Sequence, residues 1–165
     1  LFFEISPREA ELMDPRQRLL LMEAWKALED AGYGPAQLDR SRTGMFVGAE
    51  QGEYQLLGAR EGGASITANH DGVLAARLAY FLNMRGPAMA INTACSSALV
   101  ALHQACASLR TDECDTALAA GVNLLLTPHT FIGASQAGML SQDGKCHAFD
   151  RGANGMVPPE AVVVV

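Results

Sequence analysis

The chain has 165 residues and a formal net charge of −6, with 49% hydrophobic and only 18% charged residues. This composition excludes a disordered or fibrous chain and predicts a globular protein with its own core, about one domain in size. Lys and Arg (12 together) are outnumbered by Asp and Glu (18 together) and form no basic stripe. We therefore expect no nucleic-acid partner.

Two long segments, residues 86–109 and 116–142, contain no Asp, Glu, Lys or Arg. Polar residues and prolines, among them Pro87 and Pro128, interrupt both segments. A bilayer core penalises such residues, so we expect no membrane span and interpret the segments as parts buried inside a layered protein. The first residues also lack the pattern of a signal peptide, which indicates a cytoplasmic protein.

The four cysteines are Cys95, Cys106, Cys114 and Cys146. No pair has the spacing of a zinc site, and the set does not resemble a disulfide scaffold. We therefore expect reduced thiols and no metal, with structural roles for Cys106, Cys114 and Cys146.

Helix and strand signals alternate along the chain. In order, they predict a helix start at Ser6–Pro7, a helix from Asp14–Pro15 to about Ala31, a strand at 43–49, a loop at 50–65, a helix at 71–83, a buried strand at 88–93, a helix at 96–109, a buried strand at 116–126, a helix after Pro128, a polar loop at 144–155 and a strand from Ala161. Capping residues and first-turn prolines mark helix starts, and apolar runs mark the strands. This order favours an α/β layered fold without internal repeats.

Two details of this pattern carry specific expectations. The apolar spacing of the first long helix predicts one buried face, made of Leu21, Met22, Trp25, Leu28 and Ala31. The β-branched run at 162–165 predicts a strand inside a sheet with both faces covered. Because the chain ends within this run and begins without Met, we expect a fragment that is truncated at both ends.

The most informative segment is 90–100, where an apolar strand runs directly into a helix of small residues with Cys95 at the junction. A thiol at this place faces the unpaired N–H groups and positive dipole end of the helix, which favours a reactive thiolate. The small neighbours Ala94, Ser96 and Ser97 leave room for a substrate carbonyl, and the Cys95 N–H is a candidate oxyanion donor. The alternative is that Cys95 is a small buried hydrophobe, as most free cysteines are. Spacing alone leaves both interpretations open.

Ordered motifs extend along the whole chain. They are the cysteine segment 93–103, the helix segments 14–21 and 25–32, the strand 43–48, residues 76–80 and 86–87, and the later segments 120–123, 138–141, 143–146 and 148–150. Together they resemble the β-ketoacyl synthases of modular polyketide synthases. Residues 90–95 and 155–158 look most like synthases that are served by a separate acyltransferase.

The resemblance implies a thiolase-like layered αβαβα fold, of which residues 1–165 form most of the first half as a partial ketosynthase domain. It implies that Cys95 is the nucleophile that accepts an acyl group from the phosphopantetheine thioester of an acyl carrier protein. A malonyl-type extender is then decarboxylated, and its carbanion attacks the acyl-enzyme in a Claisen condensation of polyketide biosynthesis. The resemblance also implies a homodimer with the strand before Cys95 near the two-fold axis, and no cofactor bound to the domain itself.

In this family the cysteine works with two histidines, in His-Gly-Thr-Gly and Asn-x-Gly-His motifs, and with a lysine; none of these motifs occurs in the sequence. The four histidines present are His70, His103, His129 and His147. His103 comes eight residues after Cys95 on the same predicted helix. That spacing is about 12 Å along the axis and predicts a residue on the helix face. We expect His147 to be solvated, while the roles of His70 and His129 stay open.

Five other positions carry expectations. Asp14 is expected to cap a helix, and Arg77 and Tyr80 are expected to pack or to form ion pairs. Met139 either lines an acyl pocket, as the resemblance implies, or belongs to the core. Pro159 stands where the family usually has glycine, and a proline cannot adopt a positive φ.

Three functions fit these residues. The first is an elongating condensing enzyme, and the second is a non-elongating transacylase, or gatekeeper, that loads Cys95 and passes the chain on. The third is a fragment that is inactive by itself because it lacks the histidine half of the site. The sequence does not define the acyl substrate.

Overall fold

The computed structural model of the chain describes residues 2–58 and 66–165. These residues divide into two compact units, each described here by itself. The sheet unit runs to Asn123 and includes Ala161–Val165, and the loop unit is Leu124–Glu160.

The sheet unit contains short helices, longer helices and the strands of one sheet. In chain order they are α1 (Pro7–Leu12), α2 (Pro15–Asp30), α3 (Pro35–Leu38), β1 (Thr43–Ala49), α4 (Tyr54–Gly58), α5 (Ile66–Asn69), α6 (Val73–Phe81), β2 (Ala88–Ile91), α7 (Ser97–Arg110), β3 (Thr116–Asn123) and β4 (Ala161–Val164). The loop unit contains α8 (His129–Gln136). No helix in the described part of the chain has both the length and the apolar character needed to cross a membrane.

The strands form one sheet in the order β2-β1-β3-β4. β2 and β3 pair in parallel with β1, whereas β4 pairs antiparallel with β3. Gly48 of β1 is paired with Ile91 of β2 on one side and with Gly121 of β3 on the other. Because the first three strands are parallel, their C-terminal ends lie at one edge of the sheet, which is where ligands bind in open α/β sheets.

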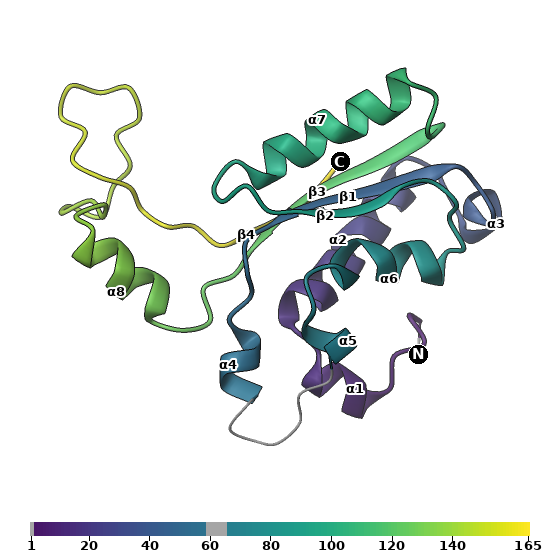
Figure 1. Cartoon of the computed structure of the whole chain (residues 1–165), viewed down its shortest axis with the longest axis horizontal. Coiled ribbons are helices and arrows are strands. Elements are labelled where there is room, and N and C mark those ends of the chain that lie inside the picture. The colour runs from purple at the N-terminus through teal and green to yellow at the C-terminus, as the bar shows by residue number, and fades with distance from the viewer. Residues whose placement is uncertain (1, 59–65) are drawn as a thin grey trace. The chain divides into compact units, whose positions relative to one another are not determined.

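Helices cover both faces of this sheet (Figure 1). α7 lies along one face, against β1 and β3, and α2 and α6 lie on the opposite face. Successive side chains of β1 point to opposite faces, as strand geometry requires. Met45 and Val47 join the larger core with α2 and α6, while Phe46 joins a smaller core with Ala101 and Ala105 of α7. This three-layer arrangement is the predicted α/β fold class.

The first two helices begin as the sequence predicts. The Ser6 Oγ accepts the N–H of Glu9 at 3.1 Å at the start of α1. The Asp14 Oδ1 accepts the N–H of Arg16 at 2.8 Å at the start of α2. Both helices also have proline in the first turn, where the missing N–H is not needed.

The buried face of α2 differs in part from the prediction. Its apolar members are Leu20, Leu21, Ala24 and Leu28, whereas Met22, expected on this face, is 48% exposed. Leu20, Ala24 and Leu28 follow one another at four-residue spacing, so they form one stripe on the helix. The apolar character of Met22 alone does not place it on that stripe.

The prediction that both outer strands are buried is wrong. Ala88, Met89 and Ala90 of β2 are exposed, because β2 pairs only with β1 in the described sheet and forms its edge. Residues of β4 alternate between exposed and half-buried. The half-buried Val162 and Val164 pack against the core shared with α2, so only one face of this strand is covered.

The prediction of a loop at 50–65 is also wrong in part. Residues Tyr54–Gly58 form α4, and residues 59–65 lie outside the described residues.

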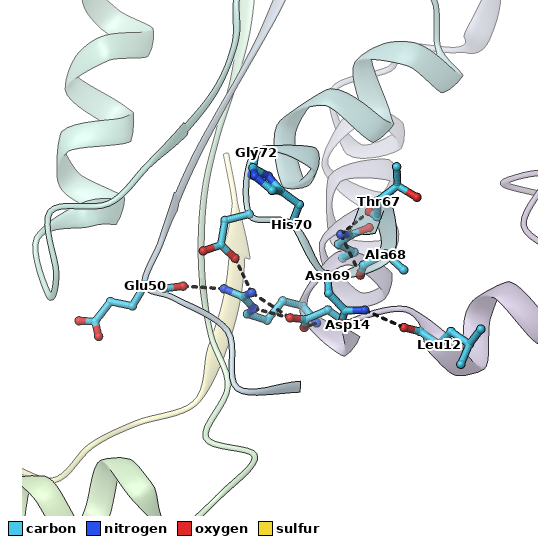
Figure 2. Close-up of polar contacts among 11 residues, drawn as sticks. Leu12, Asp14, Glu50, Thr67, Ala68, Asn69, His70 and Gly72 are labelled. Carbon is cyan, nitrogen blue, oxygen red and sulfur yellow. Dashed lines mark hydrogen bonds and ion pairs between the residues drawn. The ribbon is translucent and has the colours of Figure 1, made fainter. Parts of the chain in front are cut away.

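A buried charge network joins the start of α2 to the segment between β1 and α6 (Figure 2). The side chains of Arg16 and Asp14 are only 4% and 2% exposed. The Arg16 Nε and Nη2 donate to Asp14 Oδ2 at 3.0 and 2.8 Å. The same Nη2 donates to Asp71 Oδ1 at 2.6 Å, and Nη1 donates to the carbonyl of Glu50 at 2.5 Å. One cation therefore holds the chain at both ends of residues 50–71.

Neutral hydrogen bonds reinforce this attachment (Figure 2). The Asn69 Nδ2 donates to the carbonyl of Leu12 at 3.2 Å. The Gln17 Nε2 donates to the carbonyls of Thr67 and Ala68 at 3.2 and 3.1 Å. As a result, α5 is fixed against the connection between α1 and α2.

Burial lowers the pKa of the Arg16 guanidinium, but hydrogen bonds and charge interactions with Asp14 and Asp71 outweigh that effect and raise this pKa above its usual value. Arg16 therefore stays charged. Removing one partner of such a pair leaves the other buried without water or counter-charge, which is strongly destabilising.

We expect Arg16→Met to lower the free energy of unfolding by about 3–5 kcal/mol, because Asp14 loses its counter-charge. Native-state hydrogen exchange of α2 peptides in the complete protein measures this loss. Lys26→Met is the matched control, since Lys26 pairs with Glu23 on the same helix but is 61% exposed. Such an exposed pair contributes less than about 1 kcal/mol. Equal losses in the two variants would contradict the role assigned to Arg16.

Candidate active site

Cys95 lies where the sequence predicts it, in the connection between the end of β2 at Ile91 and the start of α7 at Ser97. It is exposed. The alternative interpretation, in which Cys95 is a small buried hydrophobe, is therefore wrong for the described structure.

The connection turns on a residue in the left-handed conformation. Ala94 has a φ of 56°, which costs an L-residue other than glycine about 1–2 kcal/mol. Asn92 stabilises the turn because its Oδ1 accepts the N–H of Ala94 at 3.0 Å. Local hydrogen bonds are thus needed to maintain the backbone immediately before Cys95.

Two serine hydroxyls supply further hydrogen bonds. Ser97 is only 4% exposed; its Oγ accepts the N–H of Thr93 at 2.9 Å and donates to the carbonyl of Ala94 at 2.6 Å. The N–H of Ser97 donates to the same carbonyl at 3.0 Å. Ser96 is exposed, and its Oγ donates to the carbonyl and the hydroxyl of Thr93 at 2.8 and 2.9 Å.

A pair of glycines lets α7 begin very close to the sheet. A Cβ on Gly48 would overlap the backbone of Ser97 and Ala98, and a Cβ on Gly121 would lie 2.7 Å from the Cβ of Ala98. Gly48 and Gly121 are direct partners across β1 and β3. The sequence patterns did not indicate either residue as part of the site, although a glycine inside a strand is itself a sign of close backbone approach.

The other three thiols differ in their surroundings. Cys114 is 2% exposed, and burial raises the pKa of its thiol, which agrees with the predicted structural role. Cys106 is half-buried on α7, and Cys146 is exposed in the loop unit. Packing within the described residues therefore does not explain Cys146.

The histidines of the sheet unit lie at the surface. His103 is exposed on α7, the helix-face position that the sequence predicts. His70 is exposed, and its Nδ1 accepts the N–H of Gly72 at 3.0 Å. Within residues 2–58 and 66–123, neither histidine forms a hydrogen bond to Cys95.

In the loop unit, hydrogen bonds converge on Asp143. Its Oδ1 accepts the Ser141 hydroxyl at 2.6 Å and the Asn154 Nδ2 at 3.3 Å, and its Oδ2 lies 2.9 Å from the His147 Nε2. The Ser141 bond first, and then those of His147 and Asn154, hold the pKa of the Asp143 carboxyl well below its usual range. His147 thus has a carboxylate partner in addition to solvent, and His129 is exposed at the start of α8.

The end of this loop, at Gly155, lies against its beginning, and Gly155 has a φ of 147°. A Cβ at Gly155 would lie 2.5 Å from the backbone of Leu140 and Ser141, so only glycine fits here. Among residues 155–160, the positive φ is at Gly155 and not at Pro159.

The remaining predictions have mixed outcomes. The cap at Asp14 is confirmed, and Arg77 forms the predicted ion pair, with its Nη1 2.8 Å from the Glu9 Oε1. Tyr80 is 90% exposed, so a packing role is wrong within the described residues. Met139 is 49% exposed, which excludes the core alternative there and leaves the acyl-pocket role as a prediction. No cluster of three or more His, Cys, Asp or Glu suited to a metal occurs in the described ranges.

Sequence comparisons identify relatives over the whole chain. The family described as Beta-ketoacyl synthase, N-terminal domain, matches residues 1–165. The chain is 60% identical to polyketide synthase ThaG from Burkholderia thailandensis and 50% identical to polyketide synthase PksL from Bacillus subtilis. These matches cover 100% and 97% of this chain but only 3% and 4% of the two relatives.

Solved structures show the same fold. The ketosynthase from module 6 of the bacillaene synthase from Bacillus subtilis 168 matches with a TM-score of 0.87 and 46% identity. The oxazolomycin ketosynthase domain from Streptomyces albus JA3453 matches with a TM-score of 0.91 and 42% identity. Each match covers 99% of this chain and, respectively, 28% and 30% of those chains. The predicted thiolase-like α/β fold is confirmed by these structures.

We expect Gly48→Ala to destabilise the protein by about 1–3 kcal/mol, because the new methyl group meets the backbone of Ser97 and Ala98, which cannot rotate away. Thermal unfolding measures the effect. Gly133→Ala is the control, since nothing lies within 4 Å of a Cβ at this α8 position and alanine is favoured over glycine in helices. A Gly48→Ala protein as stable as the parent would show that α7 does not begin so close to the sheet.

We expect Asp143→Asn to increase hydrogen exchange in residues 141–156 near neutral pH. An acid whose pKa is lower in the folded state adds stability above its ordinary pKa of about 4, and this stability is lost as the pH falls below that value. The difference in exchange between the variant and the parent should therefore shrink as the pH is lowered through about 4 toward 2. A difference that does not change with pH would contradict the lowered pKa.

Proposed function

Because the chain belongs to the β-ketoacyl synthase family, we propose that it is the N-terminal part of a ketosynthase domain and that Cys95 is the acyl-accepting nucleophile. One observation carries this proposal. Cys95 is exposed on a hydrogen-bonded turn between a parallel strand and the start of α7, where a substrate can approach the thiol.

The first step is transfer of the acyl group to Cys95. The thiolate attacks the carbonyl carbon of an acyl thioester on the phosphopantetheine arm of an acyl carrier protein. The Sγ–C bond forms, the C–S bond to the arm breaks, and the arm leaves as a thiol after taking up a proton. The first N–H groups of α7 favour negative charge at this place, and the Cys95 N–H donates to the oxyanion of the tetrahedral intermediate.

The second step is condensation. A malonyl-type extender loses carbon dioxide, and its carbanion attacks the acyl carbon, so that a C–C bond forms and the Sγ–C bond to Cys95 breaks. In this family two histidines assist this step, and their motifs do not occur in these 165 residues. We assign to this chain the residue that holds the acyl group, and to the rest of the domain the groups that promote decarboxylation.

The proposed partners are an acyl carrier protein and a second copy of the ketosynthase. The exposed edge strand β2 supports the second partner, because Ala88, Met89 and Ala90 are exposed next to the site. An exposed apolar edge favours pairing with another chain. We also propose that the exposed Met139 lines the acyl pocket.

We further propose the subtype that is served by a separate acyltransferase. Residues 90–95 and 155–158 support it by their resemblance to such synthases. The full reading frame tests this proposal, since an acyltransferase domain within the same module would contradict it.

We expect Cys95→Ala to abolish covalent acylation when the complete protein is incubated with an acyl thioester. Intact-protein mass spectrometry and peptide mapping measure the adduct. Cys106→Ala and Cys146→Ala are controls and should keep the full adduct. An adduct on another cysteine, or an undiminished adduct in Cys95→Ala, would overturn the assignment.

The same preparation separates elongation from transacylation. After loading, malonyl carrier protein is added and the products are analysed by mass. A β-ketoacyl product two carbons longer identifies an elongating enzyme, whereas transfer of the unchanged acyl group identifies the gatekeeper alternative.

A further inference from the structure

The turn before Cys95 is held by one buried hydroxyl. Ser97 Oγ accepts the N–H of Thr93 at 2.9 Å and donates to the carbonyl of Ala94 at 2.6 Å. This single side chain therefore binds the N–H of Thr93 and the carbonyl of Ala94, the two residues that precede Cys95. Ala94 has the unfavourable φ of 56° between these two bonds.

We propose that Ser97 is a positioning residue for Cys95: its hydroxyl keeps Ala94 left-handed and so fixes the direction in which the thiol leaves the turn. This inference rests on the proposed role of Cys95 as the nucleophile. Without the hydroxyl, the Thr93 N–H loses its acceptor and the Ala94 carbonyl loses one of its two donors. The remaining hydrogen bonds of the turn then offset less of the free-energy cost of the left-handed conformation at Ala94.

Ser97 itself cannot move to follow the turn. Its backbone lies against Gly48, where even a Cβ would overlap it. The position of Ser97 is fixed by the sheet, and its hydroxyl binds the turn through two hydrogen bonds of ordinary length. Ser108 on the same helix is a matched control, because it is also buried but its hydroxyl donates to the Glu113 Oε2 at 2.7 Å, away from the turn before Cys95.

The experiment compares Ser97→Ala, Ser97→Thr and Ser108→Ala with the parent in the complete protein. The probe is an acyl-N-acetylcysteamine thioester, and the rate of acylation of Cys95 is measured against its concentration. Because a displacement of about 1 Å can cost about 100-fold in rate, we expect the maximal rate in Ser97→Ala to fall about 10–100-fold. The concentration for half-maximal rate should change less than about twofold, since the binding surface is kept.

Ser97→Thr retains the hydroxyl and should recover most of the rate, and Ser108→Ala, which removes a buried hydroxyl near the other end of α7, should stay close to the parent. A folded Ser97→Ala protein with the parent's maximal rate would overturn the proposal, as would a Ser97→Thr protein that is as slow as Ser97→Ala. If Ser97→Ala folds poorly, Ala94→Gly is added, because glycine adopts the left-handed conformation without strain. Because glycine needs no hydroxyl to hold the left-handed conformation, that double variant should fold and recover part of the lost rate, and a folded double variant without acylation of Cys95 would overturn the proposal.

A second readout separates this inference from the proposed function. Alkylation of Cys95 by iodoacetamide, followed by peptide mapping, reports the thiol without requiring ketosynthase chemistry. If the parent accepts no acyl group on Cys95, the proposed function fails. Slower alkylation in Ser97→Ala would still support the positioning role, and an unchanged rate would reject it.

Discussion

The close approach of α7 to the sheet is the constraint on which the site depends. The helix begins against two paired glycines, Gly48 and Gly121, and no larger residue fits between the strands and Ser97 or Ala98. With its first turn fixed there, the chain has only a few residues in which to leave β2 and enter the helix. The left-handed Ala94 and the exposure of Cys95 follow from this short connection.

The opposite face of the sheet stabilises the same strand. Glu50 follows β1 directly, and its carbonyl accepts a hydrogen bond from the buried Arg16. Arg16 in turn is held by Asp14 and Asp71, so the exit of β1 is anchored two residues after Gly48. The charge network and the glycine pair therefore act on one strand from its two faces.

Local patterns predicted most of the elements and the place of Cys95 between a strand and a helix, because a strand that runs into a helix of small residues is contained within a dozen positions. The same patterns did not predict contacts between distant residues. Arg16 binds Asp71, which lies 55 positions later in the sequence. Gly48 likewise contacts Ser97, which belongs to a different and distant element. Exposure was also mispredicted for β2, since the apolar run of an edge strand does not differ from that of a central one.

The side-chain hydrogen bonds of Asn92, Ser96 and Ser97 join residues of the 92–97 turn to one another. The direction of Cys95 is thus set within the sheet unit, by local bonds and by the glycines beneath α7. Within the described part of the chain, neither His70 nor His103 forms a hydrogen bond to the thiol, and the family's histidine motifs are absent from these 165 residues. A thiol held in this way needs no base bonded to it to keep its geometry. On the proposed role of Cys95 as the nucleophile, a base then needs only to approach a thiol that is already in place.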